Sequence, residues 1–220
     1  MNKPAPIVHP TKKRILDAAE RLFADDGFQS TSLRGLTAEA RVNLAAVNYH
    51  FGSKEALLQA VLERRLVPLN KAQRNRLEKV RKNAQAASVR PSVRGALHAF
   101  FGPMISLRDS GPAAEDFIRL LGQSLGEQSE TIRGTLLRHI GPVQILLFDI
   151  LAEALPHMSH DCLSWRLNFA LGSMIHAMSM CPRDSFRTRR RPSVLPMTRC
   201  MLDFIAAGME APCAQYPSPA

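Results

Sequence analysis

The stretch VNLAAVNYHFGSKEAL, residues 42–57, decides the fold of this chain. Asn43 can cap a helix that begins at Leu44, and Gly52 can end that helix. A further helix begins at once, with Ser53 as its cap. The junction of the two helices holds a dense group of polar side chains: Asn48, Tyr49, His50 and Lys54.

Helical patterns also precede this stretch. Apolar residues at helical spacing predict a helix that is capped by Thr11 and runs to about Asp26. Thr31 or Ser32 can cap a short second helix that runs to Ala40. The second and third helices are joined by a very short turn, which is the arrangement of a helix-turn-helix unit.

In a helix-turn-helix unit the later helix lies in the major groove, with its N-terminal half toward the base edges. Small residues there allow close approach, and Asn48 can pair with an adenine edge. Hydroxyl, imidazole and ammonium groups at the flanks, with the N-terminus of the next helix, would reach phosphate oxygens. The predicted DNA contacts are Thr31, Arg41, Asn43, Ala45, Ala46, Asn48, Tyr49, His50 and Lys54.

Two segments carry a resemblance to a known family, RILDAAERLFADDGFQSTSLRGL (14–36) and VNLAAVNYHFGSKEALLQAVL (42–62). They contain an A-x-x-L-F…G-F…T-S opening and a Y-H-F-x-S-K-E-x-L ending. Over about residues 11–62 the chain resembles the TetR family of bacterial transcriptional regulators, and over 65–220 it follows only the family's general plan. The resemblance implies a homodimer that binds a near-palindromic DNA operator and releases it when a small molecule occupies a C-terminal helical domain.

One position departs from that family's pattern. Members usually carry glycine in the helix-turn-helix turn, where this chain has Ala40, Arg41 and Val42. The turn commonly needs a left-handed backbone, which costs a non-glycine residue about 1 kcal/mol. Two interpretations stay open: the protein tolerates the strain or a slightly altered turn, or Arg41 adds a phosphate contact.

The charge of the chain is unusual for a globular protein of 220 residues. The formal net charge of +10 favours polyanions such as nucleic acid. Most of the excess positive charge lies outside the predicted helix-turn-helix unit, because residues 64–94 hold ten lysines and arginines against Glu78 alone. We expect these cations to form a solvated face or to attract DNA at long range. The N-terminus has no secretory apolar core, and the apolar stretch at 143–155 is short for a membrane span, so we expect a cytoplasmic protein.

Beyond the reading unit the pattern stays helical, and no stretch shows the alternation of a strand. The fourth helix is expected to kink or stop at Pro68. Further helices are predicted at 92–106, 112–127, 129–154, 160–181 and 196–210. The predicted fold is all-α, a three-helix helix-turn-helix DNA-binding domain joined to a helical ligand-binding and dimerisation domain. The expected division is a flexible N-terminus at 1–10, the DNA-binding domain at 11–57, the helical domain at 58–210 and a disordered tail at 211–220.

Two sets of side chains in the helical domain are candidates for binding. The first would line a largely apolar effector pocket: His98, Phe101, Met104, Phe117, Leu121, Trp165 and Phe169. The second would form a two-fold dimer interface on the last two long helices: Leu167, Leu171, Met174, Met178, Leu202 and Ile205. In both cases the alternative is that the residues are simply core.

No cofactor, metal site or enzymatic motif is predicted. His157, His160 and Cys162 lie close in sequence, but a loop and a helix cap explain them better than a partial metal site does. The four cysteines are scattered and are expected to be free thiols. The predicted function is therefore a DNA-binding transcriptional regulator, a repressor that an apolar effector releases; the alternative is an architectural, nucleoid-type DNA-binding protein without an effector.

Overall fold

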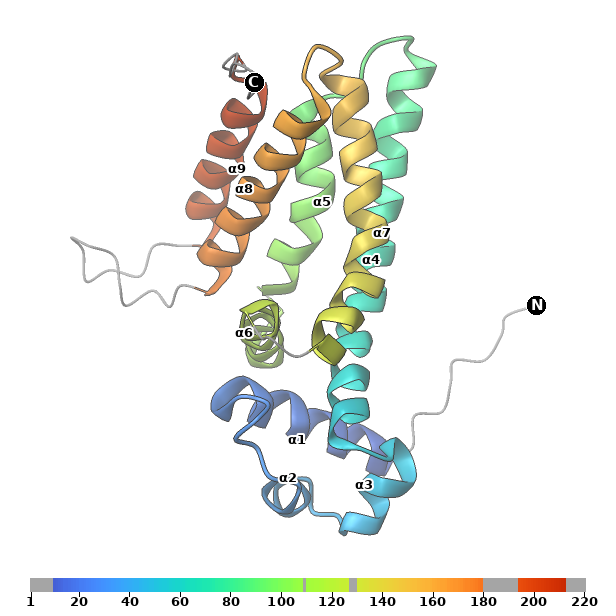
Figure 1. Ribbon diagram of the computed structural model, residues 1–220, viewed down its shortest axis with the longest axis vertical. Helices are drawn as coiled ribbons and strands as arrows, with labels where there is room; N and C mark the ends of the chain where they lie inside the picture. Colours follow the sequence, from blue (N-terminus) through green and yellow to red (C-terminus); the bar gives the residue numbers. More distant parts are fainter. Residues whose placement is uncertain (1–9, 109, 127–129, 180–193, 213–220) are drawn as a thin grey trace, which may run out of the picture. The chain divides into compact units, whose positions relative to one another are not determined.

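The computed structural model describes residues 10–108, 110–126, 130–179 and 194–212 (Figure 1). Within these ranges the regular elements are all helices, which confirms the predicted fold class. The helices are α1 (Pro10–Asp26), α2 (Leu33–Ala40), α3 (Leu44–Phe51), α4 (Lys54–Ala86), α5 (Val93–Arg108), α6 (Pro112–Gly126), α7 (Glu130–Ala154), α8 (His160–Ser179) and α9 (Val194–Glu210).

The described helices fall into two compact units. Unit 1 covers Met1–Pro68 and Arg108–His139, and unit 2 covers Leu69–Leu107 and Ile140–Ala220, each within the described ranges. The predicted domain boundary after residue 57 falls inside unit 1. Unit 1 therefore contains more than the helices that resemble a DNA-binding domain, because α6 and the start of α7 belong to it.

The core of unit 1 forms around α1. Its buried residues recur at helical spacing, with Ile15, Ala19 and Phe23 fully enclosed, and α1 packs against α2, α3 and α6. On α6 the buried face contains Phe117. Polar bonds join the rims of α1 and α6: Arg119 forms an ion pair of 2.7 Å with Asp25, and the Gln123 amide donates to the Ala24 carbonyl at 3.2 Å.

A buried carboxylate ties α1 to the start of α4. Glu20 is enclosed, and it forms ion pairs with Arg64 and, at 2.9 Å, with Arg65. Arg64 also reaches Asp17 at 2.6 Å. Burial alone would raise the pKa of Asp17, but hydrogen bonds from Lys13 and Arg64 outweigh it and lower that pKa. The expectation of a solvated face is wrong for these two arginines, because a buried carboxylate needs charged partners.

Helix α4 does not stop at Pro68, which lies inside it. Proline removes one backbone hydrogen bond, but buried side chains on both sides of it hold the helix, among them Leu66 and Leu77. Gln73 is also buried, and its amide donates to the Phe100 carbonyl of α5 at 2.7 Å. The helix ends at a left-handed residue, Ser88, with the Val89 amide bonded to the Ala84 carbonyl.

Unit 2 also holds most of α7 and all described parts of α8 and α9. Helix α7 is long and apolar enough to cross a membrane by composition, but it carries Asp149 and Glu153 and buries Val143, Leu147 and Ile150 as a core helix. The helices α8 and α9 pack side by side (Figure 1). Arg166 of α8 donates to the carbonyls that end α9, at 2.6–3.0 Å.

The predicted helix caps, helix bounds and cysteine states can be compared with those observed. Thr11 is not a cap, because α1 already includes Pro10. Apart from α4, which runs on to Ala86, the other predicted helices begin and end within a few residues of their observed bounds, and residues 180–181 lie outside the described part of the chain. Cys200 is a free, exposed thiol. Cys162 is disulfide-bonded, so the expectation of free thiols is wrong there. The predicted flexible N-terminus and tail lie almost wholly outside the described ranges.

Candidate nucleic-acid interface

A side-chain cap fixes the start of α2 and another fixes the start of α3. The Ser32 hydroxyl accepts a hydrogen bond from the Gly35 amide at 3.0 Å at the start of α2. The side-chain oxygen Oδ1 of Asn43 accepts a hydrogen bond from the Ala46 amide at 2.8 Å at the start of α3. Each cap satisfies a backbone donor that the first helical turn leaves open. Two short helices with a fixed turn between them follow from these local bonds.

The turn between α2 and α3 passes through Arg41. Its backbone is left-handed, with φ 52° and ψ 52°. Its amide donates to Ala38 at 3.2 Å, and the next amide donates to Thr37 at 3.0 Å. The side chain is exposed, and it forms no hydrogen bond or ion pair with any residue that the structure describes. The turn therefore keeps the geometry that usually takes glycine and places a free guanidinium at its tip.

Helix α3 has one buried anchor and one exposed face. Val47 is buried, whereas Ala45, Asn48 and Tyr49 are exposed. The Tyr49 ring is 86% exposed, which is far outside the range expected of a packed aromatic residue. Its ring lies 5.2 Å from the half-buried His50 ring in an edge-to-face arrangement. This face carries an amide, a hydroxyl and small side chains, the groups that can contact base edges and phosphates.

Sequence reasoning missed one residue of this face, Leu44. It is the first residue of α3 and its side chain is 49% exposed, although leucine normally packs inside. Its position directly after Asn43, the N-cap of the helix predicted to enter the major groove, could have identified it from the sequence. Such a side chain can contact the methyl group of thymine in the major groove.

Lys54 begins α4, and its ammonium group has partners inside unit 1. It donates to the Gln29 carbonyl at 3.2 Å, and it lies 4.6 Å from the centre of the Phe28 ring. Lys54 therefore fastens the segment before α2 to the start of α4. An ammonium group has three donors, so this position leaves capacity for a phosphate oxygen.

Thr31 is placed differently from the prediction. Only 4% of the residue is exposed, and its hydroxyl donates to the carbonyls of Gly27 at 2.8 Å and Leu22 at 3.2 Å. A hydroxyl that is buried and bonded in this way holds the turn after α1 together and is not exposed for a contact with a ligand. Ser32, which is exposed, is the residue that caps α2.

The predicted effector-pocket residues are divided between the two units. Phe117 and Leu121 are buried in unit 1, and Phe101 is buried in unit 2. His98 is exposed, and Met104 is half-buried. Trp165 and Phe169 are exposed on α8 and stack on each other with ring centres 6.2 Å apart. The set as predicted mixes core residues of both units with a surface pair.

The predicted dimer residues mostly face inward. Leu167, Met174, Leu202 and Ile205 are buried in unit 2, and Leu171 is half-buried; the side chain of Met178 lies outside the described set. The outward side of the same two helices carries other aromatic residues. Phe204 is 72% exposed, and Trp165 and Phe169 are more than 60% exposed. Most of the residues predicted for the dimer interface therefore lie in the core of the protomer itself.

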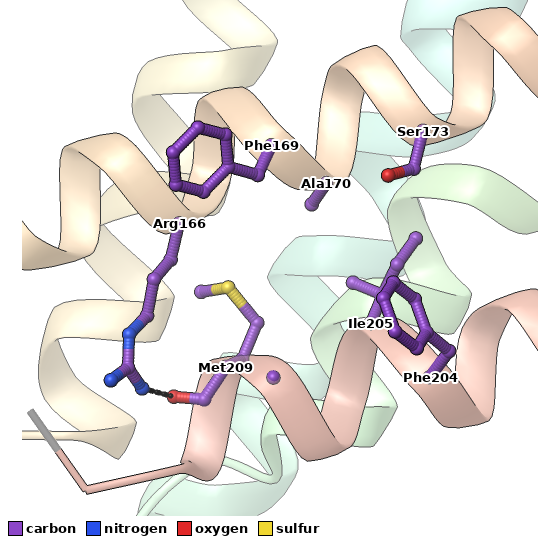
Figure 2. A pocket seen from close by; sticks show the side chains of 8 residues that line it. Arg166, Phe169, Ala170, Ser173, Phe204, Ile205 and Met209 are labelled. Carbon is purple, nitrogen blue, oxygen red and sulfur yellow. Dashed lines mark hydrogen bonds between the residues drawn. The ribbon is translucent and has the colours of Figure 1, made fainter.

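A groove between α8 and α9 accompanies these exposed aromatic residues. Figure 2 shows Phe169 and Ala170 on one side of it and Phe204 and Ile205 on the other. Its volume is about 170 Å³, which is below the usual size of a small-molecule site.

The capped helix pair and the exposed face of α3 define the class of protein, a helix-turn-helix DNA-binding protein. Residues 15–61 match the family model described as bacterial regulatory proteins, tetR family. Residues 98–208 match the model of the tetracyclin repressor-like C-terminal domain, which covers half of the chain. The chain belongs to the TetR family of transcriptional regulators, which are not enzymes.

Individual relatives agree with this assignment. The HTH-type transcriptional regulator UidR of Escherichia coli (strain K12) is 40% identical over 53 residues, which are 24% of this chain and 27% of UidR. The HTH-type nicotine-responsive transcriptional repressor HdnoR of Paenarthrobacter nicotinovorans is 43% identical over 49 residues, 22% of this chain and 25% of HdnoR. The match thus spans about a quarter of each of these relatives.

A solved structure extends the likeness in fold to nearly the whole chain. FadR from Bacillus subtilis, in complex with stearoyl-CoA, superimposes with a TM-score of 0.67 at 12% identity. The superposition covers 89% of this chain and 98% of FadR. At this identity the comparison supports the fold alone.

Proposed function

We propose that the protein is a homodimeric repressor that binds a near-palindromic operator through α3 and leaves it when an effector binds. The observation that carries the proposal is the exposed face of α3, which presents Leu44, Asn48 and Tyr49 beside a rigid, doubly capped turn. A face of this kind has no packing role in unit 1. The repressor role is supported by relatives such as HdnoR, which is named as a repressor.

The roles on DNA follow from chemistry and position. Asn48 is suited to pair with adenine, and Leu44 is suited to contact a thymine methyl group. Arg41, Tyr49 and Lys54 flank the reading face and can bind phosphates, which position the helix without reading sequence. Ala45 and Ala46 allow close approach, whereas Asn43 serves first as the cap of α3. Thr31 is left out of the proposed contacts because its hydroxyl is buried.

The proposed dimer interface is the outward face of α8 and α9, with Trp165, Phe169 and Phe204 at its centre. Three large exposed aromatic residues on two adjacent helices form an apolar patch of the kind that marks an interaction site. Gly172 and Gly208 lie on the same helices, exposed and with open space where a side chain would stand. Glycine destabilises a helix interior, but at these two positions it would let a helix of the partner protomer pack closely.

The proposed effector is a largely apolar molecule that binds the helical C-terminal domain. The family supports an effector, and FadR shares this fold and was solved with stearoyl-CoA. An effector releases DNA only if it binds the DNA-free state more tightly. Acyl-CoA thioesters of several chain lengths should raise the melting temperature and weaken operator binding, with free CoA as the control. Stabilisation by charged metabolites but by no apolar compound would contradict the apolar assignment.

The central test is to map binding on DNA that flanks the protein's own gene. A repressor of this class should protect one near-palindromic segment, with half-sites about one helical turn apart. In binding titrations Tyr49→Phe and Lys54→Ala should weaken binding to all duplexes alike, because phosphates carry no sequence information. Equal affinity of the unchanged protein for random and flanking duplexes would favour the alternative function, an architectural, nucleoid-type DNA-binding protein.

A further inference from the structure

Several cations of unit 2 are held in ion pairs. Arg81 forms an ion pair of 2.7 Å with Glu153, and Arg94 pairs with Asp203. A second group on α4 behaves differently. Lys71, Arg74, Lys79 and Lys82 are exposed, and none of them forms an ion pair or hydrogen bond with a residue in the described part of the chain.

These four residues, which we call the α4 basic face, share one side of the helix. Their spacing of three, eight and eleven residues places them within an arc of about 140°, at 100° per residue, along about 16 Å of helix. The opposite side of α4 is buried, with Gln73, Leu77 and Ala84 in the core of unit 2. Glu78, the one acidic residue between Arg64 and Arg94, lies within the same arc, one helical turn from Arg74 and from Lys82, and forms no ion pair with a described residue. The face therefore carries four cations against one carboxylate, an excess of three positive charges that the folded chain does not pair.

Lys71 and Arg74, and likewise Lys79 and Lys82, are like charges three residues apart that repel one another, and the single carboxylate of Glu78 offsets only part of that cost in the free protein. A polyanion would remove that cost. We propose that the α4 basic face binds the phosphate backbone of double-stranded DNA without reading its sequence. This inference rests on the proposed function, in that DNA is already the ligand of the chain, and it adds a second surface outside the helix-turn-helix unit.

Two other kinds of partner fit the face less well. An amphipathic helix that binds a membrane needs a free apolar side, and here the apolar side of α4 forms the core of unit 2. Protein interfaces are enriched in aromatic residues and depleted in lysine. Three of the four residues are lysines, and α4 has no aromatic residue. Long, separate ammonium groups suit a dense row of phosphates, with about one charge per 1.7 Å of duplex.

The test compares variants that change equal charge at different places. Lys71→Gln/Arg74→Gln and Lys79→Gln/Lys82→Gln each remove two charges from the face, and glutamine keeps the helical propensity. Arg90→Gln/Arg199→Gln is the matched control, because both residues are exposed cations of unit 2 outside the face. Fluorescence anisotropy measures binding to the mapped operator duplex and to a scrambled duplex of equal length, from 0.05 to about 0.4 M salt.

We expect each double variant of the face to lower the salt slope by up to about 1.8 per protomer, at about 0.9 for each lost phosphate contact. Affinity near 0.15 M salt should fall at least about tenfold, by the same factor on both duplexes. Asn48→Ala should instead weaken the operator complex alone. The control variant should leave slope and affinity close to those of the unchanged protein.

Equal behaviour of the face variants and the control would overturn the inference, since general attraction by net charge would then explain both. Unchanged DNA binding together with lost binding to phosphatidylserine vesicles would overturn it in favour of a membrane surface. Failure of the unchanged protein to prefer any operator contradicts the proposed function instead, and the scrambled duplex still decides the role of the face.

Discussion

Replacing Arg41 with glycine should change stability and DNA binding in opposite directions. The residue stands at φ 52°, where a side chain costs about 1–2 kcal/mol. Glycine removes that strain but loses about 0.5–1 kcal/mol more backbone entropy on folding. The net gain is up to about 1.5 kcal/mol, and each kcal/mol corresponds to a rise of about 2–4 °C in melting temperature for a chain of this size.

The effect on DNA binding follows from the charge of the Arg41 side chain. One lost phosphate contact lowers the salt slope by about 0.9, so a dimer loses about 1.8. Between 1 M and 0.15 M salt each contact accounts for about a fivefold change in affinity. The R41G dimer should therefore bind operator about 30-fold more weakly near 0.15 M salt, although it is the more stable protein.

Three further variants separate charge from backbone. Arg41→Lys keeps the charge and should keep the salt slope of the unchanged protein. Arg41→Asn tolerates the left-handed backbone but has no charge, so its salt slope should fall as far as that of R41G. Ser88 has the same backbone strain at φ 54° in unit 2. Ser88→Gly should raise the melting temperature as well, but should leave operator binding unchanged. Operator titrations in which R41G kept the affinity and salt slope of the unchanged protein would refute the phosphate contact and leave a merely tolerated strain.

Three other outcomes are expected. Asn48→Ala should relax the preference at one base position of the operator by about 1–3 kcal/mol, and a selection that finds the same preferred base as before would contradict that role. Phe204→Asp should give a folded monomer by light scattering and circular dichroism, because the ring is exposed in the protomer; a dimer that persists would move the interface elsewhere. Asp17→Asn should lower the melting temperature near pH 7, and Asp26→Asn is the exposed control. The difference in melting temperature should shrink as the pH falls through the lowered pKa of Asp17, because its carboxylate then protonates in the folded state as well.

The elements around the reading helix could be predicted because local bonds decide them. The side chains of Ser32, Asn43 and Ser53 each accept a hydrogen bond from the amide three residues ahead. A residue with positive φ follows each of the first three helices, namely Gly27, Arg41 and Gly52. Such signals need only a few neighbouring residues. They gave the bounds of the short helices and the turn that presents α3.

The errors concern choices that local sequence does not contain. The apolar residues of α8 and α9 revealed a helical face, but periodicity does not say whether the covering surface belongs to the same chain or to a partner. Leu167 and Ile205 were therefore assigned to a dimer when the chain's own core encloses them. Arg64 pairs with Glu20, which lies more than forty residues earlier, and the sequence offers no sign of that partner. The charged residues after Pro68 likewise concealed the long continuation of α4.

The packing of α6 against α1 limits how this protein can be taken apart or recombined. The helix-turn-helix sequence looks like a portable module, yet the compact unit that contains it also takes in Arg108–His139 from much later in the chain. A fragment that ended at Pro68 would leave the α1 surface facing water where Phe117 and its neighbours on α6 now cover it. Chimeric regulators that exchange DNA specificity with this protein should therefore carry α6 with the reading helices, or replace single residues on α3 instead.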